Sequence, residues 1–185
     1  MAEKPRFYWD ACMWIALIKR EHDRFEACRY LIEQAQRGEV EIWTSTFTYA
    51  EVYKRNCSNF LTGIEENDDQ SFEDYIEQNF VNRIQVDSDV GRAARSLLRK
   101  YPTIGKPQDA IHVASALIEN VHVLHTFDRA DLLKLNGVLF CQDGLPLQIL
   151  IPPNPPDPNK DTLFEGFSDS SGEHEVSKER KIGGT

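Results

Sequence analysis

The sequence predicts an α/β protein in which a central, mostly parallel sheet lies between two layers of helices, a three-layer α/β/α arrangement. Short apolar runs typical of buried strands alternate along the chain with longer stretches of helical periodicity. Strands that are separated by helices form parallel sheets with helices on both faces. The alternation stops after Ile151, where the composition changes. We therefore expect a folded domain over residues 1–151 and a distinct tail over residues 152–185.

The first part of the chain contains two of the expected strands. Gly38 ends an amphipathic stretch that has a 3.6-residue apolar period, and glycine is typical of a helix C-terminus. In chain order we expect a strand at 6–9, helices at 11–20 and 23–37, a strand at 40–43, and a helix at 45–55.

The second part continues the same alternation. Pro107 stands at a favoured first-turn position of a helix, and Pro102 ends the helix before it. In chain order we expect a helix near 71–80, a strand at 84–87, helices at 89–100 and 107–119, a strand at 121–126, a short helix near 129–135, and a final strand at 147–150.

Composition narrows the functional class. The chain has 185 residues, 41% of them apolar, and no apolar run approaches the roughly 20 residues that span a bilayer. The formal net charge of −9 argues against a broad basic surface that binds nucleic acid. It does not exclude a nuclease whose carboxylates are neutralised by divalent cations. The four cysteines show no close pairing, so we expect free thiols in a reducing cytosol and a cytoplasmic protein with no membrane association.

The tail, residues 152–185, is rich in Pro, Ser, Gly and charge, which predicts disorder. Its apolar residues gather in "DTLFEGF", residues 161–167. This segment is either a docking segment or a solvated stretch with incidental aromatic residues.

Four acids fall where a parallel α/β sheet gathers its ligands, beyond the carboxyl ends of the strands. Asp10 directly follows the first strand, and Asp128 follows "VHVLHT" by two residues. Asp109 falls in the first turn of its helix, and Glu51 in about the second turn. We expect all four to converge on one rim. Each also has a structural interpretation: a helix cap for Asp10 and Asp128, a favourable helix-dipole position for Asp109, and an exposed helical residue for Glu51.

The same residues resemble a known family. "FYWDACMWIAL", "TSTFTYAEVYKR", "KPQDAIHVASALIEN" and "VHVLHTFDRADL" are similar, in this order, to the motifs of PIN-domain nucleases, and among them to the VapC-type ribonuclease toxins of VapBC toxin–antitoxin pairs. The resemblance covers about residues 6–150, and the most specific motif is an aspartate that opens an alanine-rich helix followed by a strand and T-x-D. The first strand departs from it by being aromatic, and residues 56–84 form a longer, more acidic segment than in the compact toxins.

The resemblance implies a Mg²⁺- or Mn²⁺-dependent endoribonuclease with an RNA substrate, a cognate antitoxin and a homodimeric or higher assembly. It implies that Asp10, Glu51, Asp109 and Asp128 hold one or two such ions. Asp10 and Asp109 are expected as the main direct ligands and Asp128 as a further one, while Glu51 acts directly or through a metal-bound water. Thr126 is a candidate to support these ligands. Basic residues near the rim are candidates for phosphate contacts: Lys54, Arg55, Lys106 and Arg129.

Other residues and functions carry less weight. Asp131 is a weaker ligand candidate, His112 is expected to be a packed or partly exposed side chain, and the histidine spacing does not favour a zinc site. One alternative function is a catalytically inactive PIN-like scaffold that binds RNA. A haloacid-dehalogenase-like hydrolase also carries an aspartate after its first strand, but Cys12 replaces the second acid of its phosphatases.

Overall fold

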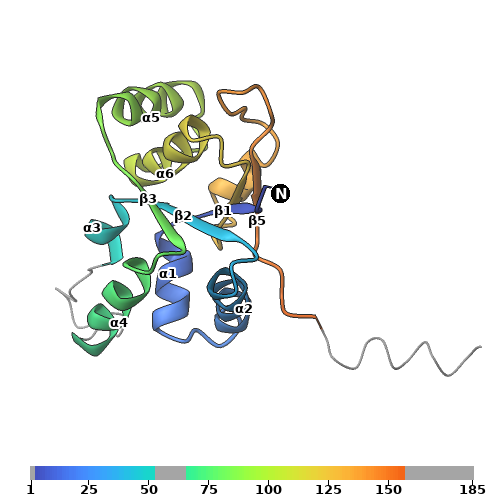
Figure 1. The fold of residues 1–185 in the computed structure, drawn as a ribbon. Helices are drawn as coiled ribbons and strands as arrows, with labels where there is room; N and C mark the ends of the chain where they lie inside the picture. Colours follow the sequence, from blue (N-terminus) through green and yellow to red (C-terminus); the bar gives the residue numbers. More distant parts are fainter. Residues whose placement is uncertain (1–2, 53–65, 157–185) are drawn as a thin grey trace, which may run out of the picture. The chain divides into compact units, whose positions relative to one another are not determined.

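The computed structural model describes residues 3–52 and 66–156, and for residues 66–69 it describes the backbone alone. Within this part, five strands form one parallel sheet in the order β3-β2-β1-β4-β5 (Figure 1). The strands are β1 (Arg6–Trp9), β2 (Glu41–Ser45), β3 (Val81–Ile84), β4 (Val123–His125) and β5 (Gln148–Leu150). Strand β1 lies in the middle of the sheet, with β2 and β3 on one side of it and β4 and β5 on the other. The chain therefore adds strands first on one side of β1 and then on the other, and the switch point lies between β1 and β4. Ligands of open parallel sheets bind at such a point.

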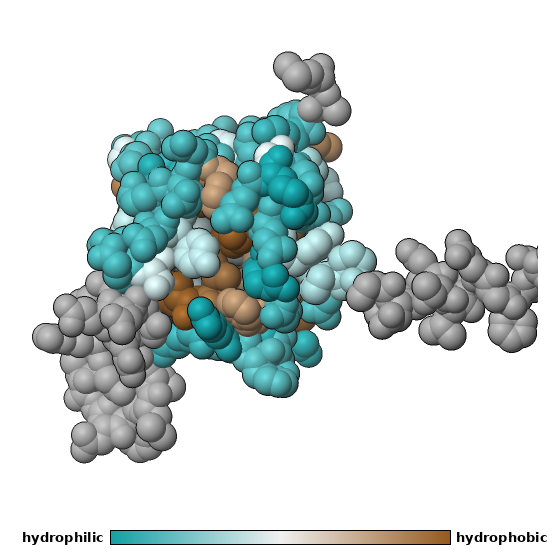
Figure 2. Space-filling model, turned by 60° about the horizontal axis from the view of Figure 1, so that its bottom comes forward, coloured by the Kyte–Doolittle hydropathy of each residue, from teal (hydrophilic) through white to brown (hydrophobic). Residues whose placement is uncertain are grey.

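Helices cover both faces of the sheet, which confirms the three-layer α/β/α prediction. In Figure 1, α5 and α6 lie on one side of the strands, and α1, α2 and α4 on the other. The helices are α1 (Ala11–Ile18), α2 (Phe25–Gln36), α3 (Thr48–Val52), α4 (Glu66–Ile76), α5 (Ser88–Lys100) and α6 (Pro107–Ile118), and a short 3₁₀ helix, η1, spans Leu132–Leu135. Figure 2 shows the side on which α1, α2 and α4 lie, where hydrophilic residues cover most of the surface around a smaller hydrophobic area.

Strand β1 connects the two cores. Successive side chains of a strand point to opposite faces, so Tyr8 packs into the core under α5 and α6, whereas Trp9 packs into the core with α1 and α2. Trp9 meets Trp14 of α1 edge-to-face, with ring centroids 5.0 Å apart. Full burial of a large apolar side chain stabilises a fold by roughly 1.5–3 kcal/mol. The aromatic first strand therefore anchors the residue that follows it, Asp10.

Three predicted elements are displaced in the structure. The helix expected near 71–80 is α4 at Glu66–Ile76. The strand expected at 84–87 is β3 at Val81–Ile84, because Asp87 instead accepts hydrogen bonds from the first turn of α5 and caps that helix. The helix expected at 45–55 begins only at Thr48, because Ser45 still pairs with Ile84 in the sheet.

Several expectations concern residues outside the described part. Outside the described residues lie the segment 161–167, Cys57, and the end of the helix expected at 45–55. The predicted domain boundary at residue 151 stays a prediction. The compact unit that contains the sheet ends at Pro155. Among the described residues, Cys12, Cys28 and Cys141 are free thiols. None of the helices in the described part has the length and apolar composition of a membrane-spanning segment.

Candidate active site

Asp10, Glu51, Asp109 and Asp128 line one cleft of about 220 Å³. Asp10 follows β1 and Asp128 follows β4, which is the neighbouring parallel strand. Their strands therefore end at the same edge. Asp109 and Glu51 reach the cleft from the first turns of α6 and α3. The structure thus brings together the four acids that the sequence scatters over more than a hundred residues.

Asp10 is both a helix cap and a wall of the cleft. Its Oδ1 accepts hydrogen bonds from the Met13 amide at 3.3 Å and from the Cys12 thiol at 2.8 Å. The first of these bonds caps α1. The residue is only 5% exposed, and this burial raises the pKa of its carboxyl, against the opposing effects of His112 and these hydrogen bonds. The two interpretations of Asp10 are therefore compatible.

Asp109 has a carboxylate oxygen that no hydrogen bond from the described residues satisfies. Pro107 starts α6, and the carboxylate two residues later turns one oxygen, Oδ2, into a buried position where it has no hydrogen-bond partner among the described residues. Burial raises the pKa of Asp109 to about 6, and the charges of Asp128 and Asp10 add to this increase while Lys106 opposes it. A buried, unpaired carboxylate oxygen costs free energy unless a cation or donor satisfies it.

Asp128 lies in a loop held by its own backbone. Its Oδ1 accepts hydrogen bonds from the amides of Ala130 and Asp131 at 2.9 and 3.0 Å, and its own amide donates to Thr126 Oγ1 at 2.9 Å. Thr126 is fully buried, and the supporting role expected for it stays a prediction. One carboxylate oxygen from each of Asp109, Asp128 and Asp131 lies within 4.8 Å of the other two. Asp131, a weak candidate in the sequence, is therefore close to two of the main acids.

Glu51 is held by a histidine. His112 Nε2 is hydrogen-bonded to Glu51 Oε2, and His112 Nδ1 lies 2.9 Å from the hydroxyl of Tyr8. His112 is buried, as the sequence predicted, but it also lines the cleft. Glu51 lies in the first turn of α3 and not in the second, because the helix starts later than expected.

Cys12 is a site residue that sequence reasoning missed. Its thiol donates to Asp10, accepts a hydrogen bond from the Phe127 amide at 3.1 Å, and lies 3.4 Å from Thr126 Oγ1. Burial, and then the negative charge of Asp10, raise the pKa of Cys12 well above its usual value. The group therefore stays a thiol that can donate. Its position two residues after Asp10, in the first turn of α1, was the available signal.

The expected basic residues are only partly placed. Lys106 lines the cleft, and Arg129 is exposed directly after Asp128. Lys54 and Arg55 lie outside the described residues, so their expected phosphate contacts stay predictions.

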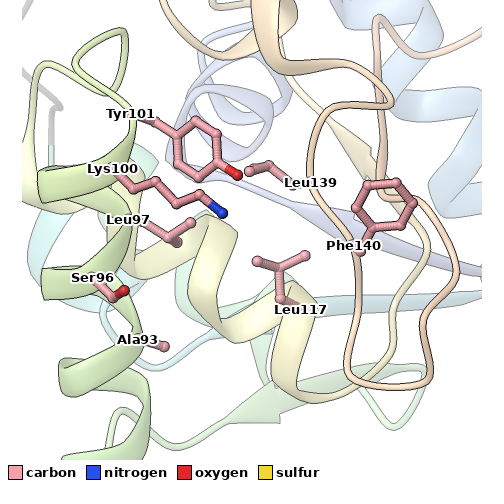
Figure 3. Close-up of a pocket in the computed structure, with 8 residues that line it drawn as sticks. All are labelled: Ala93, Ser96, Leu97, Lys100, Tyr101, Leu117, Leu139 and Phe140. Atoms are coloured by element: carbon pink, nitrogen blue, oxygen red, sulfur yellow. The ribbon is translucent and has the colours of Figure 1, made fainter.

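A different cavity, of about 320 Å³, lies between α5, α6 and residues 139–140 (Figure 3). Figure 3 shows mostly apolar side chains around it, with Lys100 and the hydroxyl groups of Ser96 and Tyr101 among them. None of the residues that line it is an acid. This cavity therefore offers no carboxylate ligand for a metal ion.

Comparison with known proteins shows the family. The sequence model of the PIN-domain family matches residues 7–137, which is more than half of the chain. The chain belongs to the PIN-domain family. All four acids of the cleft lie within the matched residues, as do Cys12 and His112. No curated protein sequence matches the chain.

Two solved structures share the PIN fold of this chain. One is VapC20 of Mycobacterium tuberculosis, described as a toxin that cleaves the sarcin–ricin loop, with 16% identity and a TM-score of 0.52; the match covers 66% of this chain and 89% of that one. The other is VapBC2 of Rickettsia felis, solved with a DNA fragment from its promoter, with 16% identity and a TM-score of 0.54; the match covers 80% of this chain and 99% of that one. At this identity the similarity is one of fold.

Proposed function

We propose that this PIN-domain protein is a metal-dependent endoribonuclease, and that it is the toxin of a toxin–antitoxin pair. The observation that carries the proposal is the convergence of four acids at the carboxyl edge of the sheet, with one oxygen of Asp109 buried and unpartnered among the described residues. The description of VapC20 as a toxin that cleaves the sarcin–ricin loop supports the choice of RNA. The complete set of acids favours an enzyme over an inactive scaffold. The family match sets the haloacid-dehalogenase alternative aside.

The donor set fits a hard divalent cation. Mg²⁺ and Mn²⁺ prefer carboxylate oxygens, and the cleft offers several of them with no neutralising arginine among its described lining residues. Asp10, Asp109 and Asp128 would hold the ion, with Asp131 beside them and Glu51 acting directly or through water. When bound, the cation offsets negative charge on the phosphodiester and makes the attacking water more acidic.

The remaining residues position these acids. Cys12 and the start of α1 hold Asp10, Thr126 holds the loop of Asp128, and His112 orients Glu51. Lys106 lines the same cleft, where its ammonium group can contact a phosphate oxygen. No side-chain nucleophile is needed, because water attacks the phosphorus.

The partners follow from the family resemblance. We propose a cognate antitoxin that inserts a peptide with a basic side chain among the acids, and a homodimeric or larger assembly in the cytoplasm. The VapBC2 structure, a related complex, supports an antitoxin partner.

The test is cleavage of a mixed RNA pool by the purified full chain with Mg²⁺ or Mn²⁺ and with EDTA. Asp10→Asn and Asp109→Asn should abolish cleavage, whereas Glu73→Gln, on the exposed surface of α4, should not change it. Cleavage that persists in EDTA or in both aspartate variants would contradict the proposal. A folded protein that binds RNA but never cleaves it would favour the inactive scaffold.

A further inference from the structure

A second cleft, of about 360 Å³, opens beside the acids. It is lined by residues of three segments: 23–27 at the start of α2, 127–129 after β4, and 151–154 after β5. Because β4 and β5 are parallel, the last two segments leave the sheet at the same edge as the acids. Asp128, in the middle of the second segment, lines the acidic cleft. The segment 127–129 is therefore a common wall of the two clefts. We call the second one the arginine cleft.

A stacked arginine forms part of this cleft. The guanidinium of Arg24 lies over the ring of Phe127, 4.9 Å from its centroid, and donates to Glu21 Oε2 at 2.9 Å. The ring below and the carboxylate at the edge hold the guanidinium in one orientation, while 46% of the side chain stays exposed. Planar guanidinium groups of this kind stack on the bases of single-stranded RNA.

Arg129 supplies a cation that is not already neutralised. It is exposed, and the structure records no ion pair or hydrogen bond for its side chain with any described residue. Arg29 and Arg37 differ, since each is paired with glutamates, whereas Arg95 and Arg99 of α5 share the unpaired state of Arg129 within the described part but do not line this cleft. Asp23 also lines the cleft, where its carboxylate lies 2.9 Å from His22 Nδ1 and 92% of its side chain is exposed to solvent. Arg129 therefore remains available to a phosphate at the border of the acidic cleft.

We propose that the arginine cleft binds the nucleotide next to the scissile bond of a single-stranded RNA. Its base stacks on the Arg24 guanidinium above Phe127, and Arg129 contacts the phosphate that links it to the acidic cleft. The common wall at 127–129 brings the two positions within reach of one strand. This inference rests on the proposed ribonuclease function and adds the subsite by which an acidic protein holds a polyanion near its acids.

The experiment measures binding of a short, fluorescent, mixed-sequence single-stranded RNA to the full chain, in an Asp109→Asn background that prevents cleavage. Arg129→Gln should lower the slope of log affinity against log salt by about one, as expected for a lost phosphate contact. Arg24→Gln should weaken binding by roughly 5- to 150-fold, the range for a lost stacked base. The slope should change little, because Glu21 already offsets the charge of Arg24. Arg95→Gln, which removes one positive charge from the exposed face of α5, should leave the affinity and the salt slope unchanged.

A further variant and the cleavage assay keep the outcomes distinct. Phe127→Leu keeps an apolar side chain under Arg24 but removes the ring, and should weaken binding as Arg24→Gln does; thermal melting checks that each variant is folded. If the wild-type chain cleaves RNA but the Arg24 and Arg129 variants bind as Arg95→Gln does, the subsite is refuted and the ribonuclease stands. If the wild-type chain neither binds nor cleaves RNA, both proposals fail.

Discussion

Replacing Asp109 by asparagine should stabilise the metal-free protein at neutral pH while it abolishes activity. Asp109 is held among Asp10 and Asp128 with one oxygen buried and unpartnered among the described residues, and its pKa is raised to about 6 from an ordinary value of 3.8. A raised pKa means that the folded state binds the proton more tightly than the unfolded chain. The stability that this proton provides is fully present below about pH 4 and is lost as the pH rises through about 6.

The size of the effect follows from the same shift. About two pKa units correspond to roughly 3 kcal/mol, which we discount to about 1–2 kcal/mol because part of the carboxylate is open to solvent. Asparagine keeps the shape and removes the charge. For a chain of this size, the melting temperature at pH 7 should therefore rise by about 3–8 °C.

The assay is thermal melting of wild type, Asp109→Asn and the surface control Glu73→Gln between pH 4 and pH 8 in EDTA, then with Mn²⁺. In EDTA the advantage of Asp109→Asn should grow with pH and level off above pH 6, and Glu73→Gln should show no such trend. Added Mn²⁺ should stabilise wild type more than Asp109→Asn, because a ligand that binds the folded state stabilises it. An Asp109→Asn variant that is less stable than wild type at pH 7 in EDTA would refute the electrostatic reasoning.

Substitutions at three further residues test the supports of the site. Leu124→Ala, in the centre of β4 and fully buried, should lower the free energy of unfolding by about 2–5 kcal/mol in urea titration, and a smaller loss would contradict its core position. Tyr8→Phe leaves His112 Nδ1 buried without its partner, which should lower the free energy of unfolding by about 1–3 kcal/mol. It should also lower kcat with little change of KM, whereas an equal change of kcat and KM would argue against a positioning role. Cys12→Ala should raise the Mn²⁺ concentration needed for cleavage, and Cys12→Ser should restore part of the loss; identical metal titrations would show that the thiol does not hold Asp10.

The sequence predicted those features that depend on local pattern and topology. Alternating strands and helices were sufficient for the sheet, and the position of Asp10 and Asp128 after two strands predicted that they would meet. Asp109 was also predictable, because Pro107 marks the start of its helix. The boundaries of elements were less accurate where side chains decided them: Asp87 caps α5, and the strand expected at 84–87 is β3, which ends at Ile84.

The remaining parts of the site depend on pairings between distant segments. Tyr8 and His112 are 104 residues apart and meet only because β1 and α6 pack together, so no local pattern predicts their hydrogen bond. Cys12 was visible in the sequence, but its role depends on Thr126 and the Phe127 amide, more than a hundred residues away. Arg24 is a comparable case, since it gains its ring partner only when α2 lies beside the end of β4.

These contacts explain how a buried acid is tolerated directly after the first strand. Asp10 replaces part of its lost hydration with the Met13 amide and the Cys12 thiol, and both bonds go to Oδ1. Asp109 has no such hydrogen bond at Oδ2 from the described residues, and the charge of Lys106 offsets only part of the cost of its burial. A cation that binds among these acids relieves that cost, whereas an arginine built into the same place would remove the need for the cation. Among the described residues, arginine is absent from the lining of the acidic cleft and present in the cleft next to it. This distribution fits one division of roles: the acids hold the ion, and the arginines hold the strand.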